Sequence, residues 1–247
     1  MSSRIPRIHW PHSLSEGNTV ELDASAAQHI VRVLRLGPGQ AIRLFDGKGL
    51  EADGRLQQVA RKSVVVRLEA VRCASLESPL QVTLAQAVCR SDRMDFALQK
   101  AVELGVSTII PLMAERSRPP GDPRRLARKQ AHWQGVIIAA CEQSGRAHVP
   151  WCTPVQSLDN WLQAKPAAVD MGLVLDPAAG CRLRDCPRPR GKITVLIGPE
   201  GGLSRAELQQ ATTCGFWPLR LGPRILRTET AGIATLAGLQ VLWGDLG

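Results

Sequence analysis

The 247-residue sequence contains no tyrosine, and aromatic residues make up only 4% of it. Proteins that bind single-stranded nucleic acid without sequence preference stack successive bases on aromatic side chains. Few such side chains are present here, so extensive base stacking is not expected. The length permits one large domain or two smaller ones, and 44% hydrophobic residues are typical of a globular protein with a packed core.

Cysteine and histidine form no recognisable metal or disulfide pattern. The seven cysteines are odd in number, and no two of them have Cys-x-x-Cys spacing. The five histidines are scattered: His9, His12, His29, His132 and His148. We therefore expect reduced thiols and no bound metal, as in a cytosolic protein.

Long apolar segments are missing as well. No apolar run approaches the roughly 20 residues that a membrane-spanning helix needs. The first residues, Met-Ser-Ser-Arg-Ile-Pro-Arg, lack the apolar core of a secretory signal. The sequence therefore predicts a soluble, cytoplasmic protein with no membrane partner.

Positive charge is in excess. Lys and Arg total 31 against 22 acidic residues, which gives a net charge of +9. Such a balance favours polyanionic partners, above all nucleic acid, although a solvated basic surface without a partner is the alternative. With few aromatic residues, we expect recognition of a folded RNA by its shape and backbone together with one exposed base.

The first part of the chain, to about Arg72, is rich in predicted strands. Alternating patterns predict strands at residues 41–46, 50–59 and 63–71. One helix is predicted over residues 24–36, where apolar residues recur at helical spacing before Gly37-Pro-Gly39. Short strands with one helix indicate a small β-barrel-like domain.

From Leu80 onward, predicted strands and helices alternate. Asp122 is expected to cap a long helix that has Pro123 in its first position. Strands are predicted at residues 80–88, 106–113, 167–175, 192–197 and 216–221, and helices at 91–104, 122–142, after Ser204 and after Thr228. This alternation predicts an α/β domain with a mostly parallel sheet.

One predicted strand, Ile193-Thr-Val-Leu-Ile197, runs directly into Gly198-Pro-Glu-Gly-Gly202. Glycines at the carboxyl end of a buried parallel strand permit tight turns and close approach of a ligand. Ser204 and Glu207 form a capping box that starts the next helix. A plain strand–turn–helix connection is the alternative, but it does not require the enclosed carboxylate of Glu200. The glycine pattern matches neither a Walker A loop nor G-x-G-x-x-G.

A second strand, Trp217-Pro-Leu-Arg-Leu221, is broken by Gly222-Pro223 and followed by Arg224 and Arg227. The next helix carries small residues from Ala231 onward, which suits close packing in the core, at a dimer interface, or both. Together the two segments place two glycine-bearing loops, one carboxylate and two arginines at one sheet edge. This set favours a cofactor pocket over a protease or metal site.

The segments Ile197-Gly-Pro-Glu-Gly-Gly-Leu-Ser204 and Leu221-Gly-Pro-Arg-Ile-Leu-Arg-Thr-Glu-Thr-Ala231 resemble the second and third motifs of SPOUT methyltransferases. More narrowly, they resemble the RsmE family, which methylates N3 of a uridine in small-subunit ribosomal RNA. The resemblance extends to Arg4-Ile-Pro-Arg7, His29-Ile-Val-Arg-Val-Leu-Arg35, Phe45-Asp-Gly47, Glu103-Leu-Gly-Val106, Ala139-Ala-Cys-Glu-Gln-Ser-Gly-Arg146 and Gly244-Asp-Leu-Gly247. One departure is Asp176-Pro177, where relatives often carry His-Pro.

The resemblance implies an RNA-binding PUA-like β-barrel over residues 1–72, a linker over 73–79 and a SPOUT methyltransferase domain over 80–247. It also implies a deep trefoil knot, which is a rare exception to the usual rules of chain threading. The expected methyl donor is S-adenosylmethionine, which leaves as S-adenosylhomocysteine. The expected partners are 16S rRNA in the small ribosomal subunit and a second copy of the chain.

Site residues follow from the same resemblance and from the charges of the two loops. Arg227, with Arg224 as the alternative, is expected to stabilise the uracil anion, and Glu229 to orient the arginine or accept the proton. Backbone expected around the cofactor belongs to Leu175, Ile197, Gly198, Glu200, Gly201, Leu221, Gly222, Ile225 and Leu226. RNA contacts are expected from Arg4, Arg7, His29, Arg32, Arg35, Arg90, Arg93, Arg116 and Arg146. Open alternatives are another RNA methyltransferase of the superfamily, for example one acting on ribose 2′-oxygen, and an inactive rRNA-binding assembly factor.

Overall fold

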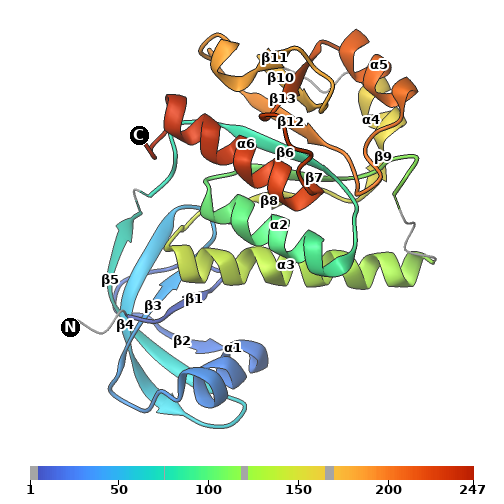
Figure 1. The fold of residues 1–247 in the computed structure, drawn as a ribbon. Coiled ribbons are helices and arrows are strands. Elements are labelled where there is room, and N and C mark those ends of the chain that lie inside the picture. Colours follow the sequence, from blue (N-terminus) through green and yellow to red (C-terminus); the bar gives the residue numbers. More distant parts are fainter. Residues whose placement is uncertain (1–4, 75, 118–121, 165–169) are drawn as a thin grey trace. The chain divides into compact units, whose positions relative to one another are not determined.

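The computed structural model describes residues 5–74, 76–117, 122–164 and 170–247 (Figure 1). The chain divides into two compact units. The N-terminal unit contains Met1–Glu77 together with Cys141–Val149, and the C-terminal unit contains Ser78–Ala140 and Pro150–Gly247. Each unit is described by itself below.

The N-terminal unit is built on a curled five-stranded sheet with the order β1-β3-β4-β5-β2 (Figure 1). Its elements are β1 (Arg7–His9), β2 (Thr19–Leu22), α1 (Ala24–Gln28), the π-helical segment η1 (His29–Leu34), β3 (Ala41–Phe45), β4 (Leu50–Val59) and β5 (Val64–Cys73). The β1–β3 pair is parallel and the other pairs are antiparallel. Alternate residues such as Ile42, Leu44 and Val66 point to one side of the sheet and form the core with Ile30.

The predicted strands at residues 41–46, 50–59 and 63–71 are confirmed as β3, β4 and β5. The single α-helix predicted over residues 24–36 is wrong in its second half. Asp23 caps α1 by accepting a hydrogen bond from the Ala26 N–H (2.8 Å), but the chain widens to π-helical turns from His29 and ends at Arg35 with φ +53°. Such wide turns keep the same apolar face, so periodicity alone could not distinguish them.

The C-terminal unit is an α/β domain in which all described strand pairs are parallel, as predicted. The sheet order is β11-β13-β10-β12-β6-β7-β8, and β9 also pairs with β7. Its elements are β6 (Val82–Ala87), α2 (Ser91–Glu103), β7 (Thr108–Met113), α3 (Pro123–Ser144), β8 (Trp151–Cys152), β9 (Gln156–Ser157), α4 (Leu158–Gln163), β10 (Met171–Leu175), β11 (Cys181–Arg182), the 3-10 turn η2 (Leu183–Asp185), β12 (Ile193–Ile197), α5 (Arg205–Thr213), β13 (Phe216–Arg220) and α6 (Thr228–Trp243). The last turn of α3 belongs to the N-terminal unit.

Helices cover both faces of this sheet, which explains its apolar central strands. All five residues of β12 are buried. Helices α4 and α5 pack on one face through Trp161, Leu162 and Ala211, and α2 packs beside α6 (Figure 1). A strand buried on both faces reads as a continuous run of β-branched and aliphatic residues, and this is the pattern seen in Ile193–Ile197.

Two predicted helix starts are confirmed in atomic detail. The Asp122 carboxylate accepts hydrogen bonds from the backbone N–H groups of Arg124 (2.7 Å) and Arg125 (3.0 Å). Ser204 and Glu207 form the predicted capping box at the start of α5. The short elements α4, β8, β9 and β11 were not predicted, because they are too brief to show a period. No helix within the described residues is long and apolar enough to cross a membrane.

Candidate active site

Three neighbouring strands of the C-terminal unit end beside one another. β10 lies between β13 and β12, so the segments after Leu175, Ile197 and Arg220 emerge along the same sheet edge. We call residues 198–202 the first loop and residues 221–227 the second loop. Ligands in open α/β sheets bind at the carboxyl edge of the strands, so this is the expected location for a site.

A pocket of about 450 Å³ lies at this edge. All nine residues predicted to surround a cofactor line it: Leu175, Ile197, Gly198, Glu200, Gly201, Leu221, Gly222, Ile225 and Leu226. The lining also includes residues that the sequence did not predict: Asp176, Pro177, Pro199, Gly202, Leu203, Leu208, Leu219, Arg220, Thr228 and Ala231. The two loops therefore line the same pocket, and its walls contain both apolar side chains and glycine backbone.

Glycine is required at specific points of both loops. Gly202 and Gly222 have φ near +70°, a left-handed conformation that side chains disfavour. At Gly198 the constraint is close approach: a Cβ atom there would lie 2.9 Å from the backbone nitrogen of Leu203. The first loop thus folds back on itself too tightly for any larger residue.

Glu200, the carboxylate enclosed by the first loop, is held from α2. It accepts a hydrogen bond from the backbone N–H of Arg90 (3.0 Å), and the Arg93 guanidinium lies 3.5 Å from it. Arg93 also lies 4.0 Å from the Glu229 carboxylate, so it bridges one acidic residue from the first loop and one from α6. On the other side of the loop, Arg116 donates to the Gly201 carbonyl (2.8 Å).

The two arginines of the second loop are free to meet a ligand. Arg224 and Arg227 are exposed and line the pocket, and neither has an ion-pair partner among the described residues. Glu229 is only 8% exposed and does not line the pocket. Its side chain faces Arg93, while its second carboxylate oxygen has no hydrogen-bond partner within the described residues. The structure therefore brings Arg224 and Arg227 to the pocket and places Glu229 behind it.

A buried thiol lies near these carboxylates. Cys89 follows β6 and is 5% exposed. Burial, together with the negative charges of Glu200 and Glu229, raises the pKa of Cys89 to about 12. The thiol therefore stays protonated at neutral pH and is a poor nucleophile. No group of three or more His, Cys, Asp or Glu residues within the described parts of the chain is arranged to hold a metal ion.

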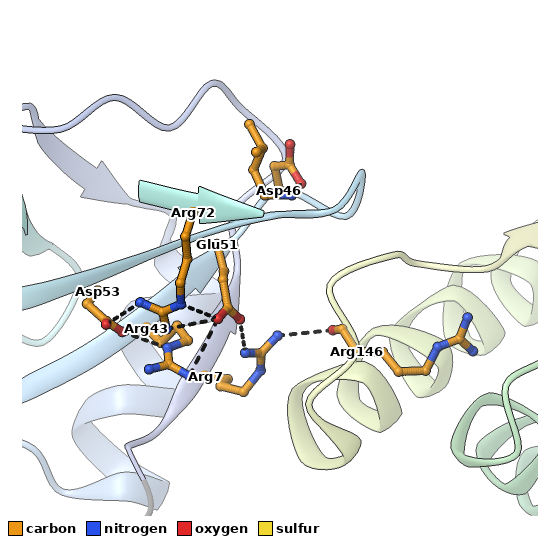
Figure 2. Close-up of polar contacts among 8 residues, drawn as sticks. Arg7, Arg43, Asp46, Glu51, Asp53, Arg72 and Arg146 are labelled. Carbon is orange, nitrogen blue, oxygen red and sulfur yellow. Dashed lines mark hydrogen bonds and ion pairs between the residues drawn. The ribbon is translucent and has the colours of Figure 1, made fainter. Parts of the chain in front are cut away.

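Two arginines predicted to contact RNA, Arg7 and Arg146, are buried in ion pairs of the N-terminal unit. Figure 2 shows the pair that Arg7 forms with Glu51. Arg7 pairs with Glu51, and its guanidinium donates to the Arg146 carbonyl (3.1 Å). The Arg146 side chain is bound by the carboxylate of Glu77. Arg7 is 9% exposed and Arg146 is 5% exposed, so both guanidinium groups are enclosed by protein.

The remaining predicted RNA contacts are differently placed. In the N-terminal unit, Arg32 and Arg35 are exposed at η1, while His29 is half-buried. In the C-terminal unit, Arg90 and Arg116 are exposed near the first loop, and Arg93 is half-buried there. Arg4 lies outside the described residues.

The chain thus combines a parallel α/β unit, which carries a glycine-lined pocket, with a small unit built on a curled sheet. Two family models match the chain accordingly. The RNA methyltransferase domain matches residues 76–240, and the RNA methyltransferase PUA domain matches residues 22–69. The predicted fold class, an α/β methyltransferase domain with an N-terminal PUA-like domain, is confirmed, while the knot stays a prediction.

A relative that matches over its full length shows which family of RNA methyltransferases the chain belongs to. Ribosomal RNA small subunit methyltransferase E from Buchnera aphidicola is 32% identical over 246 residues, with complete coverage of both chains. The chain belongs to this family, as the sequence motifs predicted.

Two solved structures share the whole fold. Ribosomal RNA small subunit methyltransferase E from Neisseria gonorrhoeae, bound to S-adenosyl methionine, is 41% identical with a TM-score of 0.92, covering 99% of this chain and 100% of that one. A putative methyltransferase from Legionella pneumophila, in complex with the bound cofactor SAM, is 40% identical with a TM-score of 0.95 at the same coverage.

Proposed function

We propose that this protein transfers a methyl group from S-adenosylmethionine to N3 of one uridine of 16S rRNA in the small ribosomal subunit. The proposal rests mainly on the pocket. Two glycine-bearing loops line it, and two arginines of the second loop have no ion-pair partner among the described residues. Relatives of about 40% identity over nearly the whole chain are described as bound to the same methyl donor, which supports the choice of cofactor.

The pocket lining fits such a cofactor. Gly198, Gly201 and Gly222 expose peptide groups for hydrogen bonds, and Leu175 and Ile225 offer apolar surface for an adenine ring. Glu200, held in place by Arg90 and Arg93, is suited to bind an amino group. When bound, S-adenosylmethionine supplies a methyl group on a sulfonium cation.

Arg227 is the residue that we assign to the chemistry. Uracil N3 carries a proton, and the loss of this proton to solvent water leaves negative charge on the ring and its two oxygens. An arginine held beside one of these oxygens stabilises that charge as it develops. Arg227, immediately before α6, is exposed in the pocket, and Arg224 is three residues away on the same loop. Glu229 is buried against Arg93, so a positioning role fits it better than proton acceptance.

RNA binding is assigned to the exposed arginines. Arg32 and Arg35 in the N-terminal unit, and Arg90 and Arg116 in the C-terminal unit, present charges that phosphates can reach. Arg7 and Arg146 are enclosed by protein and are better explained as structural residues. We further propose that the chain acts as a homodimer in the cytoplasm, where its ribosomal substrate is found; light scattering measures the oligomeric state.

Methyl transfer to purified small subunits tests the proposal. The subunits come from cells that lack N3 methylation at the target, and the product is mapped by mass spectrometry. N3 methylation blocks Watson–Crick pairing, so a reverse-transcription stop at one uridine is expected. A methyl group on ribose would instead identify a 2′-oxygen methyltransferase. Absence of transfer, with no S-adenosylmethionine binding by calorimetry, would identify an inactive assembly factor.

A further inference from the structure

The two loops of the pocket are joined by one hydroxyl group, that of Thr228. Its oxygen donates a 2.5 Å hydrogen bond to the carbonyl of Gly198 and accepts a 3.0 Å hydrogen bond from the side-chain amide of Gln86. Gly198 begins the first loop, and Thr228 directly follows the second loop as the first residue of α6. Gln86 lies near the end of β6, opposite Ile197 in the strand register. Strand β6 is thus a third element that contacts the hydrogen bond between the first loop and the start of α6.

The direction of these hydrogen bonds is fixed by the groups involved. A carbonyl only accepts, so the single hydroxyl proton of Thr228 goes to Gly198, and the hydroxyl oxygen must receive a proton from Gln86. The same Gln86 nitrogen donates to the carbonyl of Ala87 (3.1 Å), which also only accepts. The Thr228 oxygen and the Ala87 carbonyl both need a donor, so the side-chain nitrogen of Gln86, and not its oxygen, must face them.

This arrangement is buried and incomplete. Gln86 is fully buried and Thr228 is 6% exposed. The Gln86 side-chain oxygen has no hydrogen-bond partner within the described residues. A buried polar atom left unpaired lowers stability, and an apolar side chain of similar size would avoid that loss. Stability alone therefore does not explain a glutamine at this place, whereas orientation of the Thr228 hydroxyl does.

We infer that Thr228, oriented by Gln86, is a positioning residue that sets Arg227 relative to the first loop. The inference rests on the proposed function, since it concerns where Arg227 meets the substrate. Arg227 is the N-cap residue of α6, and its own side chain makes no capping hydrogen bond. Thr228, the next residue, is held by its hydrogen bond to Gly198. Gly198 belongs to the first loop, which we assign to cofactor binding.

Thr228→Val tests this inference because it removes the hydroxyl and keeps the side-chain shape. Misplacement of a reacting group by about 1 Å can cost roughly 100-fold in rate, so we expect kcat to fall by about 10- to 100-fold. The KM for S-adenosylmethionine should change much less, because the loop residues that bind it remain. Thr228→Ser keeps the hydroxyl and should restore most of kcat.

Thr235→Val is the matched control. Thr235 lies on the same helix and is fully buried, but its hydroxyl donates only to the Ala231 carbonyl within α6 (2.8 Å). Its substitution removes the same chemical group without touching either loop, so kcat should stay near the wild-type value. An equal loss of kcat in Thr228→Val and Thr235→Val would overturn the inference.

A double-mutant cycle with Arg227→Ala gives the sharpest readout. If Thr228 acts through Arg227, then Thr228→Val should have little further effect on the single-turnover rate once Arg227 is gone. The same fold-loss in both backgrounds would overturn the inference. Should Thr228→Val fail to fold, Gln86→Met is put through the same cycle, with a loss expected only when Arg227 is present. A wild-type protein that transfers no methyl group would refute the proposed function itself, which separates the two failures.

Discussion

The guanidinium of Arg7 and the carboxylate of Glu51 form an ion pair inside the N-terminal unit, and less than a tenth of either side chain is exposed. The pair belongs to a network across neighbouring strands (Figure 2). Arg43 and Arg72 also lie against Glu51, and both bind Asp53. Three arginines around two carboxylates keep the buried charges compensated.

Glu51→Gln should destabilise this unit strongly. Removing one partner of a buried pair leaves the other charge unpaired, which costs about 3 kcal/mol in free energy of unfolding. Glu69→Gln is the control, because Glu69 pairs with Arg55 on strands β4 and β5 at the surface, where the expected cost is below about 1 kcal/mol. Urea unfolding at neutral pH measures both. Equal free energies of unfolding for the two variants would contradict the larger stabilisation that we assign to the buried Arg7–Glu51 pair.

The same pair predicts a dependence on pH. Burial alone would raise the pKa of Glu51, but the hydrogen bond and charge of Arg7, with the charges of Arg43 and Arg72, lower it below its ordinary value of 4.5. A carboxyl whose pKa is lower when folded contributes stability above pH 4.5 and loses it as the pH falls toward the folded pKa. Wild-type stability should therefore fall more steeply than that of Glu51→Gln below that pH. If the free energies of unfolding of the two proteins fell equally with pH, Glu51 would not contribute to the acid sensitivity.

Close approach at Gly198 predicts a binding defect. A Cβ atom there would meet the backbone of Leu203, so Gly198→Ala must open the first loop. We expect the Kd for S-adenosylmethionine to rise by at least about tenfold, equivalent to 1.4 kcal/mol. Gly180→Ala is the control, since a Cβ at Gly180 has nothing within 4 Å and its φ is not positive. Calorimetry that finds the same Kd for Gly198→Ala and wild type would refute the assignment of the first loop.

Thiol reactivity tests the burial of two cysteines, Cys89 near the pocket and Cys141 in the N-terminal unit. Cys73 is exposed, whereas burial raises the pKa values of Cys89 and Cys141 to about 12. The thiolate is the reactive form, so at about pH 8 alkylation of Cys73 should be at least about 100-fold faster than that of the two buried thiols. Mass spectrometry after brief iodoacetamide treatment gives the rates, and urea should abolish the difference. Rapid modification of Cys89 in the folded protein would contradict the packing described here.

The pocket could be predicted from the sequence because its chemistry is local. Glycines directly after a buried strand mark a sheet edge, and both loops carry this mark at Gly198 and Gly222. The order of the strands could not be predicted in this way. β10 pairs with both β12 and β13, a contact set by packing of the complete sheet and not by any local pattern.

Contacts between residues distant in the sequence could not be predicted from it either. Arg7 and Arg146 are 139 positions apart, and only the folded chain shows that they share a buried network. Gln86 and Thr228 are 142 positions apart, and neither carries a charge that would mark it as a site residue. The sequence therefore did not show that two of the arginines predicted to contact RNA are buried, or that Gln86 and Thr228 are hydrogen-bonded to each other.

The difference between Arg224 and Arg227 gives the last prediction. Both line the pocket without an ion-pair partner among the described residues, but only Arg227 adjoins the anchored Thr228. A donor that stabilises charge in a transition state is worth about 100- to 1,000-fold in kcat, so Arg227→Ala should lose activity on that scale. Arg224→Ala, on the part of the loop farther from that anchor, should chiefly raise the KM for RNA. Single-turnover rates at saturating RNA and S-adenosylmethionine separate the two. Near wild-type rates for Arg227→Ala, with a large loss for Arg224→Ala, would exchange their roles.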